Sequence, residues 1–230
     1  MRMAAVEHAL AILERLQVDY RTANSIDVGG TKQVWLSVPR RTPPTFTERL
    51  KQRIGQQLGV DVPIPTTEVI VTDNPLLTRV PRLQFFDRGF NTEALGAEVD
   101  TTGDFLREED VRPFLDTFDL IFCFDTLEHV SDPFTFCRNL VRIAKPGGVI
   151  YLATVFSWEY HPSPQDYYRF SPEGLRECFA HTEGEVLACG WDTPDISVYI
   201  CVRRPVATDT IQSNEEQRIG KEPSYEAKDK

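Results

Sequence analysis

Residues 118–148 restrict the fold of this chain more than any other segment. They open with a short apolar run, 120–124, whose length and β-rich composition predict a strand buried on both faces. A helix follows, because 131–133 offers a side-chain oxygen cap and a proline for the first turn. The sequence KPGG at 145–148 ends that helix, and a second apolar run occupies 149–155. Together these signals predict a parallel βαβ unit, in which ligands bind at the carboxyl ends of the strands.

Strand and helix signals also alternate along the rest of the chain. An amphipathic helix is expected over 3–18 and a first strand over 25–28. Apolar residues recur every four positions over 46–58, which predicts the first crossover helix, and a second strand is expected over 68–72. The remaining expected elements are a short strand or loop at 82–86, a capped helix at 171–180 and a terminal antiparallel hairpin at 185–189 and 196–202. This alternation predicts a doubly wound α/β fold.

The charge balance argues against one class of partner. The chain has 25 basic and 35 acidic residues, a net charge of −10 and a pI near 4.9. Nucleic-acid binding without sequence preference depends on basic side chains that neutralise phosphates, so no nucleic-acid partner is expected.

The cysteines and the apolar runs indicate a compartment. Five cysteines occur without a CxxC pair or a Cys/His metal spacing, so we expect buried free thiols and no metal ion. No apolar run approaches the ~20 residues that span a bilayer, and the amino terminus lacks the core of a signal peptide. We therefore expect a cytoplasmic protein with no membrane partner.

The apolar pattern also suggests domain limits. It continues to residue 204 and then stops, because 205–230 is polar and charged. We expect one domain over 1–204, with its amino-terminal helix inside 1–20, and a disordered tail over 205–230. The oligomeric state is not predicted.

The segment 118–148 also carries a family resemblance. Its pattern FD-x-I-x5-LEHV-x-DP, followed by a helix and KPGG, resembles the second half of class I S-adenosylmethionine-dependent methyltransferases. Within that class it is most similar to the type 11 group, whose members act on small molecules and in glycan pathways. The resemblance implies a Rossmann-like seven-stranded sheet, mostly parallel with a carboxyl-terminal antiparallel strand, and S-adenosyl-L-methionine as the cofactor.

The end of the first strand is where this family carries an acid and a glycine-rich loop, D/E-x-G-x-G-x-G. Here Asp27 and Gly29 match, and the sequence then departs from the pattern at 30–33, where only the neighbouring Gly30 is a glycine. A turn of two glycines can still allow close approach, so Gly29 and Gly30 stay candidates for cofactor binding. Glycine is used in such loops because the backbone must approach the ligand closely. A plain turn between a strand and a loop is the alternative for this segment.

The resemblance implies further cofactor-binding residues at later strand ends. Asp73 would bind both ribose hydroxyls from the end of the expected second strand, although a turn-forming role is the alternative. Asp104 would accept from the adenine amino group, and Phe105 would pack against the adenine ring. Phe124 and Asp125 end the strand of the βαβ unit and would complete the cofactor side.

Two histidines are the candidates for catalysis. His129 follows the strand of the βαβ unit and could act as a general base, or it could brace the next helix. His161 begins a segment that resembles the pattern H-x2-P-x-D-Y-x-R-F-[ST] of the glycan-linked branch. In that segment Asp166 is the third candidate for the catalytic group and could help to hold a polar substrate. Arg169 could form a bidentate pair with Asp166 or with an acidic group of the substrate. The alternative is that the segment forms a lid stiffened by prolines.

Three interpretations of the function follow. The first is a methyltransferase that acts on a small molecule or glycan, with oxygen as the favoured acceptor atom. The second is a catalytically inactive methyltransferase-like binding or scaffold domain, which the incomplete glycine loop supports. The third is an enzyme for NAD or nucleotide sugars, which the missing G-x-G-x-x-G pattern opposes.

Overall fold

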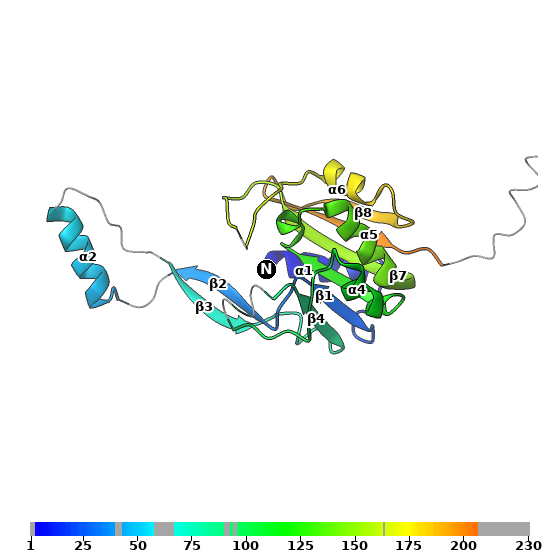
Figure 1. Ribbon diagram of the computed structural model, residues 1–230, viewed down its shortest axis with the longest axis horizontal. Helices are drawn as coiled ribbons and strands as arrows, with labels where there is room; N and C mark the ends of the chain where they lie inside the picture. Colours follow the sequence, from blue (N-terminus) through cyan, green and yellow to red (C-terminus); the bar gives the residue numbers. More distant parts are fainter. Residues whose placement is uncertain are drawn as a thin grey trace, which may run out of the picture.

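A seven-stranded sheet forms the body of the protein. The computed structural model describes residues 3–39, 43–57, 67–89, 93, 96–162 and 164–206 (Figure 1). The strand order is β5-β4-β1-β6-β7-β9-β8, and β9 runs antiparallel to both of its neighbours while the pairs from β5 to β7 are parallel. The strands are β1 (Ser25–Val28), β4 (Leu83–Asp87), β5 (Thr101–Thr102), β6 (Phe118–Phe124), β7 (Ala144–Val155), β8 (Glu185–Thr193) and β9 (Ser197–Arg203). The predicted fold class is confirmed.

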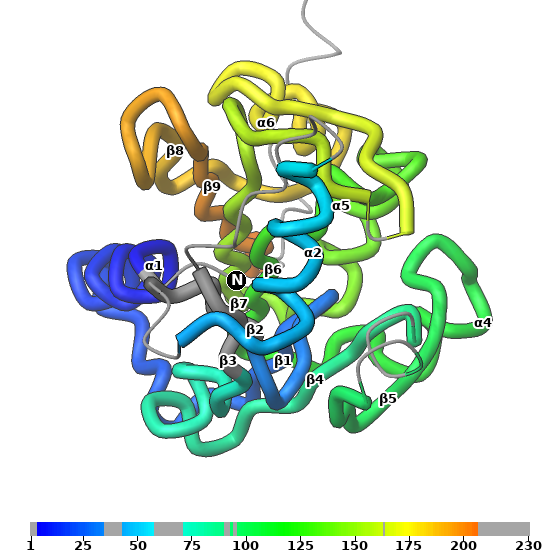
Figure 2. The backbone as a smooth tube through the Cα atoms, turned by 90° about the vertical axis from the view of Figure 1, so that its left-hand side faces the viewer, coloured from blue at the N-terminus to red at the C-terminus, as the bar shows by residue number. Residues whose placement is uncertain are grey.

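Helices cover both faces of the sheet. Helix α1 (Met3–Arg15) packs on one face, and the opposite face carries α4 (Glu108–Val111), α5 (Pro133–Ile143) and α6 (Pro172–Phe179) (Figure 2). Short 3-10 turns, η1 (Arg112–Phe114) and η2 (Leu127–His129), precede and follow β6. Among the described residues, no helix combines the length and apolar composition needed to cross a membrane.

Strand β6 is buried on both faces, as its apolar sequence predicts. Leu120 and Phe122 join the cluster under α1, whereas Ile121 and Cys123 join the cluster under α5 and α6. Burying one such side chain contributes about 1.5–3 kcal/mol relative to leaving it exposed. All five cysteines are free thiols, and four of them are buried, as expected.

The predicted helix starts in the second half of the chain are confirmed. Asp132 caps α5, because its Oδ1 accepts from the backbone N–H of Thr135 at 3.0 Å and Pro133 occupies the first turn. Ser171 caps α6 in the same way and accepts from Gly174 at 3.1 Å.

The region between β1 and β4 differs from the prediction. Strands β2 (Gln33–Pro39) and β3 (Thr67–Asp73) pair antiparallel in a sheet of their own, and α2 (Phe46–Gln57) lies between them in the sequence. Figure 1 shows this β2–β3 arm projecting from the body, with α2 beyond its tip. The segment expected to be the first crossover helix is therefore helical but does not cover the seven-stranded sheet.

Exposure explains why periodicity misled this assignment. The residues that recur every four positions in α2 are largely exposed, at 81% for Phe46, 44% for Leu50 and 46% for Ile54. An apolar period of 3.6 residues shows that a helix has an apolar face, but it does not show what covers that face. The expected strand over 68–72 exists within β3, yet the second parallel strand of the main sheet is β4.

Arg204 directly follows β9 and anchors the carboxyl end of that strand. Its guanidinium pairs with Asp116 and with Glu183, and it donates to the carbonyl oxygens of Ala144 at 2.7 Å and Arg142 at 3.2 Å. The tail expected over 205–230 lies outside the described residues except for its first two. The domain limits therefore stay a prediction.

Truncation after residue 206 and substitution of Arg204 should affect stability differently. Removing residues 207–230 should leave the melting temperature nearly unchanged, because the contacts of Arg204 remain. Arg204→Ala should lower the free energy of unfolding by about 1–3 kcal/mol, since it strands carbonyl and carboxylate partners. Arg107→Ala is the matched control, because that side chain is 64% exposed and pairs only with surface Glu109 among the described residues. Thermal and urea unfolding would measure both, and a large loss on truncation would contradict the domain limits.

Candidate active site

Three carboxylates gather at the carboxyl ends of three adjacent strands. Asp27 lies in β1 between its partners Phe85 of β4 and Phe122 of β6. Asp87 ends β4, and Asp125 directly follows β6 with a positive φ of 46°. Because parallel strands end at a common edge, these acids form one negatively charged region where such folds bind ligands.

Asp27 is the most unusual of the three. Its side chain is fully buried, and neither carboxylate oxygen has a hydrogen-bond partner among the described residues. The amide of Asn74 lies close enough to lower the pKa of Asp27, but its Nδ2 donates to the carbonyl of Thr31 at 2.9 Å. Burial nevertheless raises the pKa of Asp27 from 3.8 to about 7, and the charges of Asp125 and Asp87 add to the rise.

The two glycines after β1, Gly29 and Gly30, lie against the side chains of Thr126 and Asp27. Gly29 has a φ of +85°, and a Cβ added there would lie 2.3 Å from Oγ1 of Thr126. A Cβ on Gly30 would lie 2.0 Å from Oδ2 of Asp27. Both positions therefore exclude a side chain, because Thr126 and Asp27 of the protein itself fill the space that a Cβ would need.

Asp87 occupies the place that the sequence analysis gave to Asp73. Asp87 is buried, and its Oδ1 accepts from the backbone N–H of Gly89 at 2.8 Å. Asp73 is exposed and stands opposite Gln33 in the β2–β3 arm, away from the ends of the main sheet. The sequence does contain the signal for Asp87, since four largely apolar residues precede it in β4.

The other expected cofactor residues lie near the same edge with contacts of their own. Asp104 accepts from the N–H of Leu106 at 3.0 Å and forms an ion pair with Arg88 at 3.3 Å. Phe105 is a core residue whose ring lies edge-on to Phe86 at 5.4 Å. Phe124 is buried on the opposite face, under α1.

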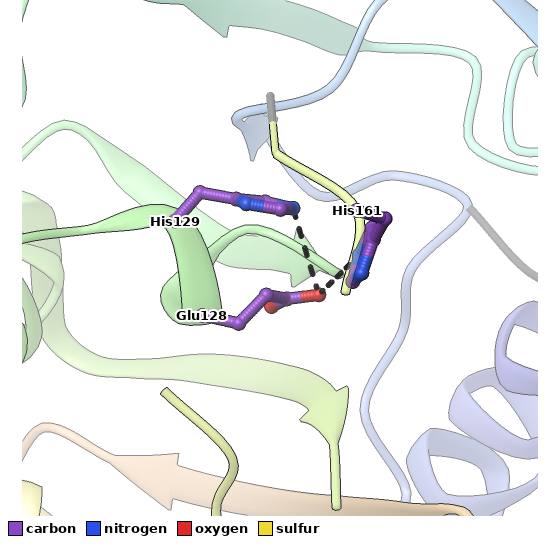
Figure 3. Close-up of side chains that lie close together, drawn as sticks. All are labelled: Glu128, His129 and His161. Atoms are coloured by element: carbon purple, nitrogen blue, oxygen red, sulfur yellow. Dashed lines mark ion pairs between the residues drawn. The ribbon is translucent and has the colours of Figure 1, made fainter. Parts of the chain in front are cut away.

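A second cluster lies where β6 and β7 end, and it joins Glu128, His129 and His161. Glu128 is fully buried, and Oγ1 of Thr154 donates to its Oε2 at 2.6 Å. Its Oε1 lies 3.9 Å from Nε2 of His129 and 3.8 Å from Nε2 of His161. Figure 3 shows both imidazoles turned toward this carboxylate, one from η2 and the other from the loop after β7.

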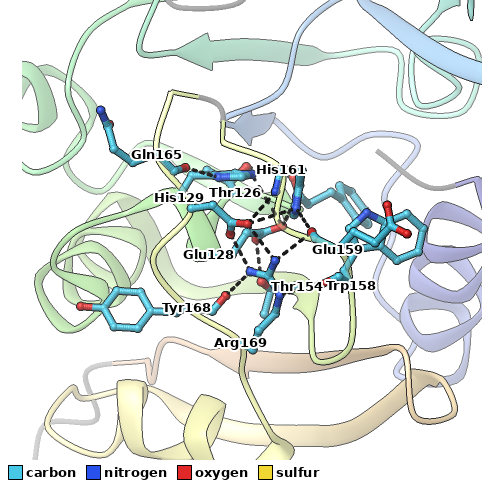
Figure 4. A network of polar contacts seen from close by, with 12 residues as sticks. Thr126, Glu128, His129, Thr154, Trp158, Glu159, His161, Gln165, Tyr168 and Arg169 are labelled. Atoms are coloured by element: carbon cyan, nitrogen blue, oxygen red, sulfur yellow. Dashed lines mark hydrogen bonds and ion pairs between the residues drawn. The ribbon is translucent and has the colours of Figure 1, made fainter. Parts of the chain in front are cut away.

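Asp166 fastens the loop that carries His161. It accepts two hydrogen bonds from Arg169, at 2.5 and 2.8 Å, and one from the backbone N–H of His161 at 2.8 Å (Figure 4). These bonds, led by those from Arg169, hold the pKa of Asp166 well below its usual range. The bidentate pair is confirmed, and its geometry indicates that Asp166 positions His161 through the backbone.

The two site regions are joined through η2. Thr126, which closes over Gly29, lies two residues before Glu128. The carbonyl of Glu128 accepts from the backbone N–H groups of Tyr167 and Tyr168, at 2.8 and 3.2 Å. One short turn therefore fixes both the glycine side and the histidine side of the site.

The pH dependence of stability should reveal Asp27. Its folded-state pKa lies above the unfolded value of 3.8, so the folded protein binds the extra proton and loses stability as the pH rises from about 4 to about 7. The full loss is at most about 4 kcal/mol for a shift of this size. Asp27→Asn should abolish this part of the pH dependence, and Asp73→Asn, at an exposed acid, is the control. Urea unfolding of the ligand-free protein at pH 5 and pH 8 would measure it, and parallel pH profiles for wild type and Asp27→Asn would contradict it.

Comparison with known proteins finds similarity to methyltransferases over parts of the chain. The family model described as "Methyltransferase domain" matches residues 92–152. Ubiquinone biosynthesis O-methyltransferases are similar over short stretches, with 45% identity over 38 residues for the Pseudomonas aeruginosa protein and 38% over 40 residues for that of Aliivibrio fischeri. The chain spans only 16% and 17% of the length of these two relatives.

Solved structures show a more distant likeness along most of the chain. The 1,6-didemethyltoxoflavin-N1-methyltransferase of Burkholderia thailandensis has 12% identity and a TM-score of 0.46, with 88% of this chain and 79% of that chain covered. An S-adenosylmethionine-dependent methyltransferase from Mesorhizobium loti has 10% identity and a TM-score of 0.44, with 86% and 98% covered. The family match is limited to residues 92–152, and the main sheet has the seven strands, mostly parallel with an antiparallel β9, that the resemblance implied.

Proposed function

We propose that this protein binds S-adenosylmethionine and methylates a small polar molecule or glycan, with oxygen as the acceptor atom. The buried carboxylate of Asp27 carries the proposal. It lies against Gly29 and Gly30 with no hydrogen-bond partner among the described residues, so it is suited to a cationic group brought by a ligand. S-adenosylmethionine brings an ammonium group, and when bound it supplies an electrophilic methyl group on a sulfonium.

The neighbouring acids suit the rest of that cofactor. Asp87, in place of Asp73, would accept from the ribose hydroxyls, because a carboxylate offers two acceptor oxygens to a vicinal diol. Asp104 and Phe105 would serve the adenine end. Phe124 and Asp125, at the end of β6, would complete the side that faces the methyl group.

The histidine cluster would receive the acceptor. Each imidazole directs Nε2 toward the shared site, and a neutral imidazole can accept the proton of a hydroxyl. Burial lowers the pKa of His129, so that this ring is neutral at physiological pH. Asp166 would act by holding His161 in place.

Exposed aromatic rings favour a ring-bearing acceptor. On the loop after β7, Trp158 is 51% exposed, Tyr160 is 76% exposed and Tyr167 is 48% exposed. Flat rings on a polar loop can pack against the apolar faces of a sugar or an aromatic substrate. This exposure supports the small-molecule or glycan assignment.

Cofactor binding should release a proton. Asp27 is half protonated near pH 7 before binding, and an ammonium beside it favours the charged form, so affinity should rise with pH up to about pH 7. Titration calorimetry in two buffers of different ionisation enthalpy would detect the proton. Asp27→Asn and Asp87→Asn should each weaken binding of S-adenosylmethionine by about 1–3 kcal/mol, whereas Asp73→Asn should not.

The same titration separates the alternatives. Saturable heat with S-adenosylmethionine and S-adenosylhomocysteine but without turnover of any acceptor would favour the inactive binding domain. Saturable heat with NAD alone would favour the dinucleotide enzyme. No heat with any of the three would contradict the proposal.

A general base should show itself in the rate of transfer. His161→Ala should lower kcat by about 10²–10⁴ while leaving the affinity for S-adenosylmethionine nearly unchanged. The wild-type rate should rise with pH through the ionisation of the histidine that acts as the base, because only the neutral imidazole accepts a proton. His181→Ala is the control, since that histidine is 79% exposed and lies outside the site. An unchanged kcat in His161→Ala would show that positioning alone suffices.

A further inference from the structure

We propose that Glu128, His129 and His161 form a binding site for a divalent transition-metal cation. One ligand atom of each residue lies within 4.8 Å of the others, and Oε1 of Glu128 is 3.8–3.9 Å from both Nε2 atoms. Ligand atoms around one zinc-sized ion stand about 3–3.6 Å apart, given metal–ligand bonds near 2.1 Å. The two distances from Glu128 exceed this range by only a few tenths of an ångström.

The tautomers of both histidines are set for coordination. Nδ1 of His129 lies 2.6 Å from the carbonyl oxygen of Gln165, and Nδ1 of His161 lies 2.8 Å from that of Glu159. A carbonyl oxygen only accepts, so each Nδ1 carries the proton and each Nε2 presents a lone pair. Histidines that bind metals usually donate their other ring nitrogen to a carbonyl or carboxylate in this way.

Three electron-pair donors therefore face one another. Two Nε2 lone pairs and a carboxylate oxygen converge at separations that are too long for direct hydrogen bonds. A cation placed among them could be bound by all three. An extra proton on one ring is the competing solution, and metal titration distinguishes the two.

The surrounding structure holds the carboxylate in place. The hydroxyl of Thr154 binds Oε2 of Glu128, and this bond orients Oε1 toward the imidazoles. Nothing of the Glu128 side chain is exposed, whereas His129 is 13% and His161 is 35% exposed. The open side of the site is thus next to His161, and there an ion would keep positions for a ligand from solution.

The local charge also admits a divalent ion. Glu128 and Asp166 contribute two negative charges, and Arg169 contributes one positive charge that is directed mainly at Asp166. A divalent cation would turn the net charge of this group from −1 to +1, which favours an anionic oxygen. Two imidazoles and one carboxylate suit zinc, iron(II), cobalt(II) or nickel(II) better than magnesium, which prefers oxygen ligands.

The role that we infer for the ion rests on the proposed function. An acceptor hydroxyl on the open side would bind the ion through its oxygen, and the ion would lower the pKa of that hydroxyl so that its proton passes to solvent water. With the ion bound, His129 and His161 act as ligands, and the ion takes over the activation that the free imidazoles would otherwise provide.

Direct metal titration tests the proposal. The full chain is treated with a chelator, dialysed and titrated at pH 7.5 with Zn²⁺ by calorimetry and with Co²⁺ by visible absorption. We expect one ion per chain, no saturable binding of Mg²⁺, and no thiolate-to-cobalt charge-transfer band, since the five cysteines lie outside the cluster. His129→Ala, His161→Ala and Glu128→Gln should each weaken Zn²⁺ binding tenfold or more.

The controls keep the test decisive. His181→Ala should bind Zn²⁺ as wild type does, because that exposed histidine is remote from the cluster. Glu128→Gln changes a buried group, so His161→Ala, at a partly exposed side chain, carries the test if the glutamine variant fails to fold. No saturable Zn²⁺ or Co²⁺ binding, or equal binding by wild type and His161→Ala, would overturn the proposal.

Cofactor binding by the same metal-free protein distinguishes the two proposals. If S-adenosylmethionine binds and neither metal does, the methyltransferase assignment stands and the metal site falls. If a metal binds at the three residues and S-adenosylmethionine does not, the metal site stands and the methyltransferase assignment falls.

Discussion

The double pairing of β6 is the constraint on which the site depends. This strand bonds to β1 on one side and to β7 on the other, and apolar side chains bury both of its faces. The backbone at the carboxyl end of β6 therefore has little conformational freedom, and the turn that follows is held in place by it. Thr126 is thereby set over Gly29, and Glu128 is set under the two histidines. A rigid strand end is what a site needs when its groups must be held to within a fraction of an ångström.

Two buried carboxylates then account for most of the chemistry that the site can offer. Asp27 and Glu128 are both fully buried, and burying a charged group costs free energy unless an ion pair or hydrogen bonds compensate for the lost hydration. Asp27 responds by a raised pKa, whereas Glu128 is bonded to Thr154 and faces two imidazoles. Titratable groups with pKa values shifted in this way are common at functional sites, because a bound ligand can stabilise a buried charge that the protein alone does not stabilise. Under the proposed function, Asp27 would mark the cofactor side of the site and Glu128 the acceptor side.

Local sequence signals predicted the second half of the chain well and the first half poorly. The strand and the capped helix of residues 118–143 depend on contacts close in sequence, and the structure has both. The turn expected at 145–148 is absent, because those residues belong to β7, which begins at Ala144. Between β1 and β6, however, two runs end in an acid, one at Asp73 and one at Asp87. Which run pairs with β1 is a long-range choice that local propensity does not encode. The same limit explains why the apolar period of α2 suggested a crossover helix.

The β2–β3 arm also explains the incomplete glycine loop. In the family pattern the loop leads toward a crossover helix, but here the chain enters β2 within three residues of Gly30. Asn74 holds that path, since its backbone N–H donates to Lys32 at 2.7 Å and its side chain donates to Thr31. Glycine is then needed only where backbone meets Thr126 and where Asp27 folds back, and both of those positions keep it. The positions of the later glycines in the pattern, Thr31 and Gln33, lead directly into this arm.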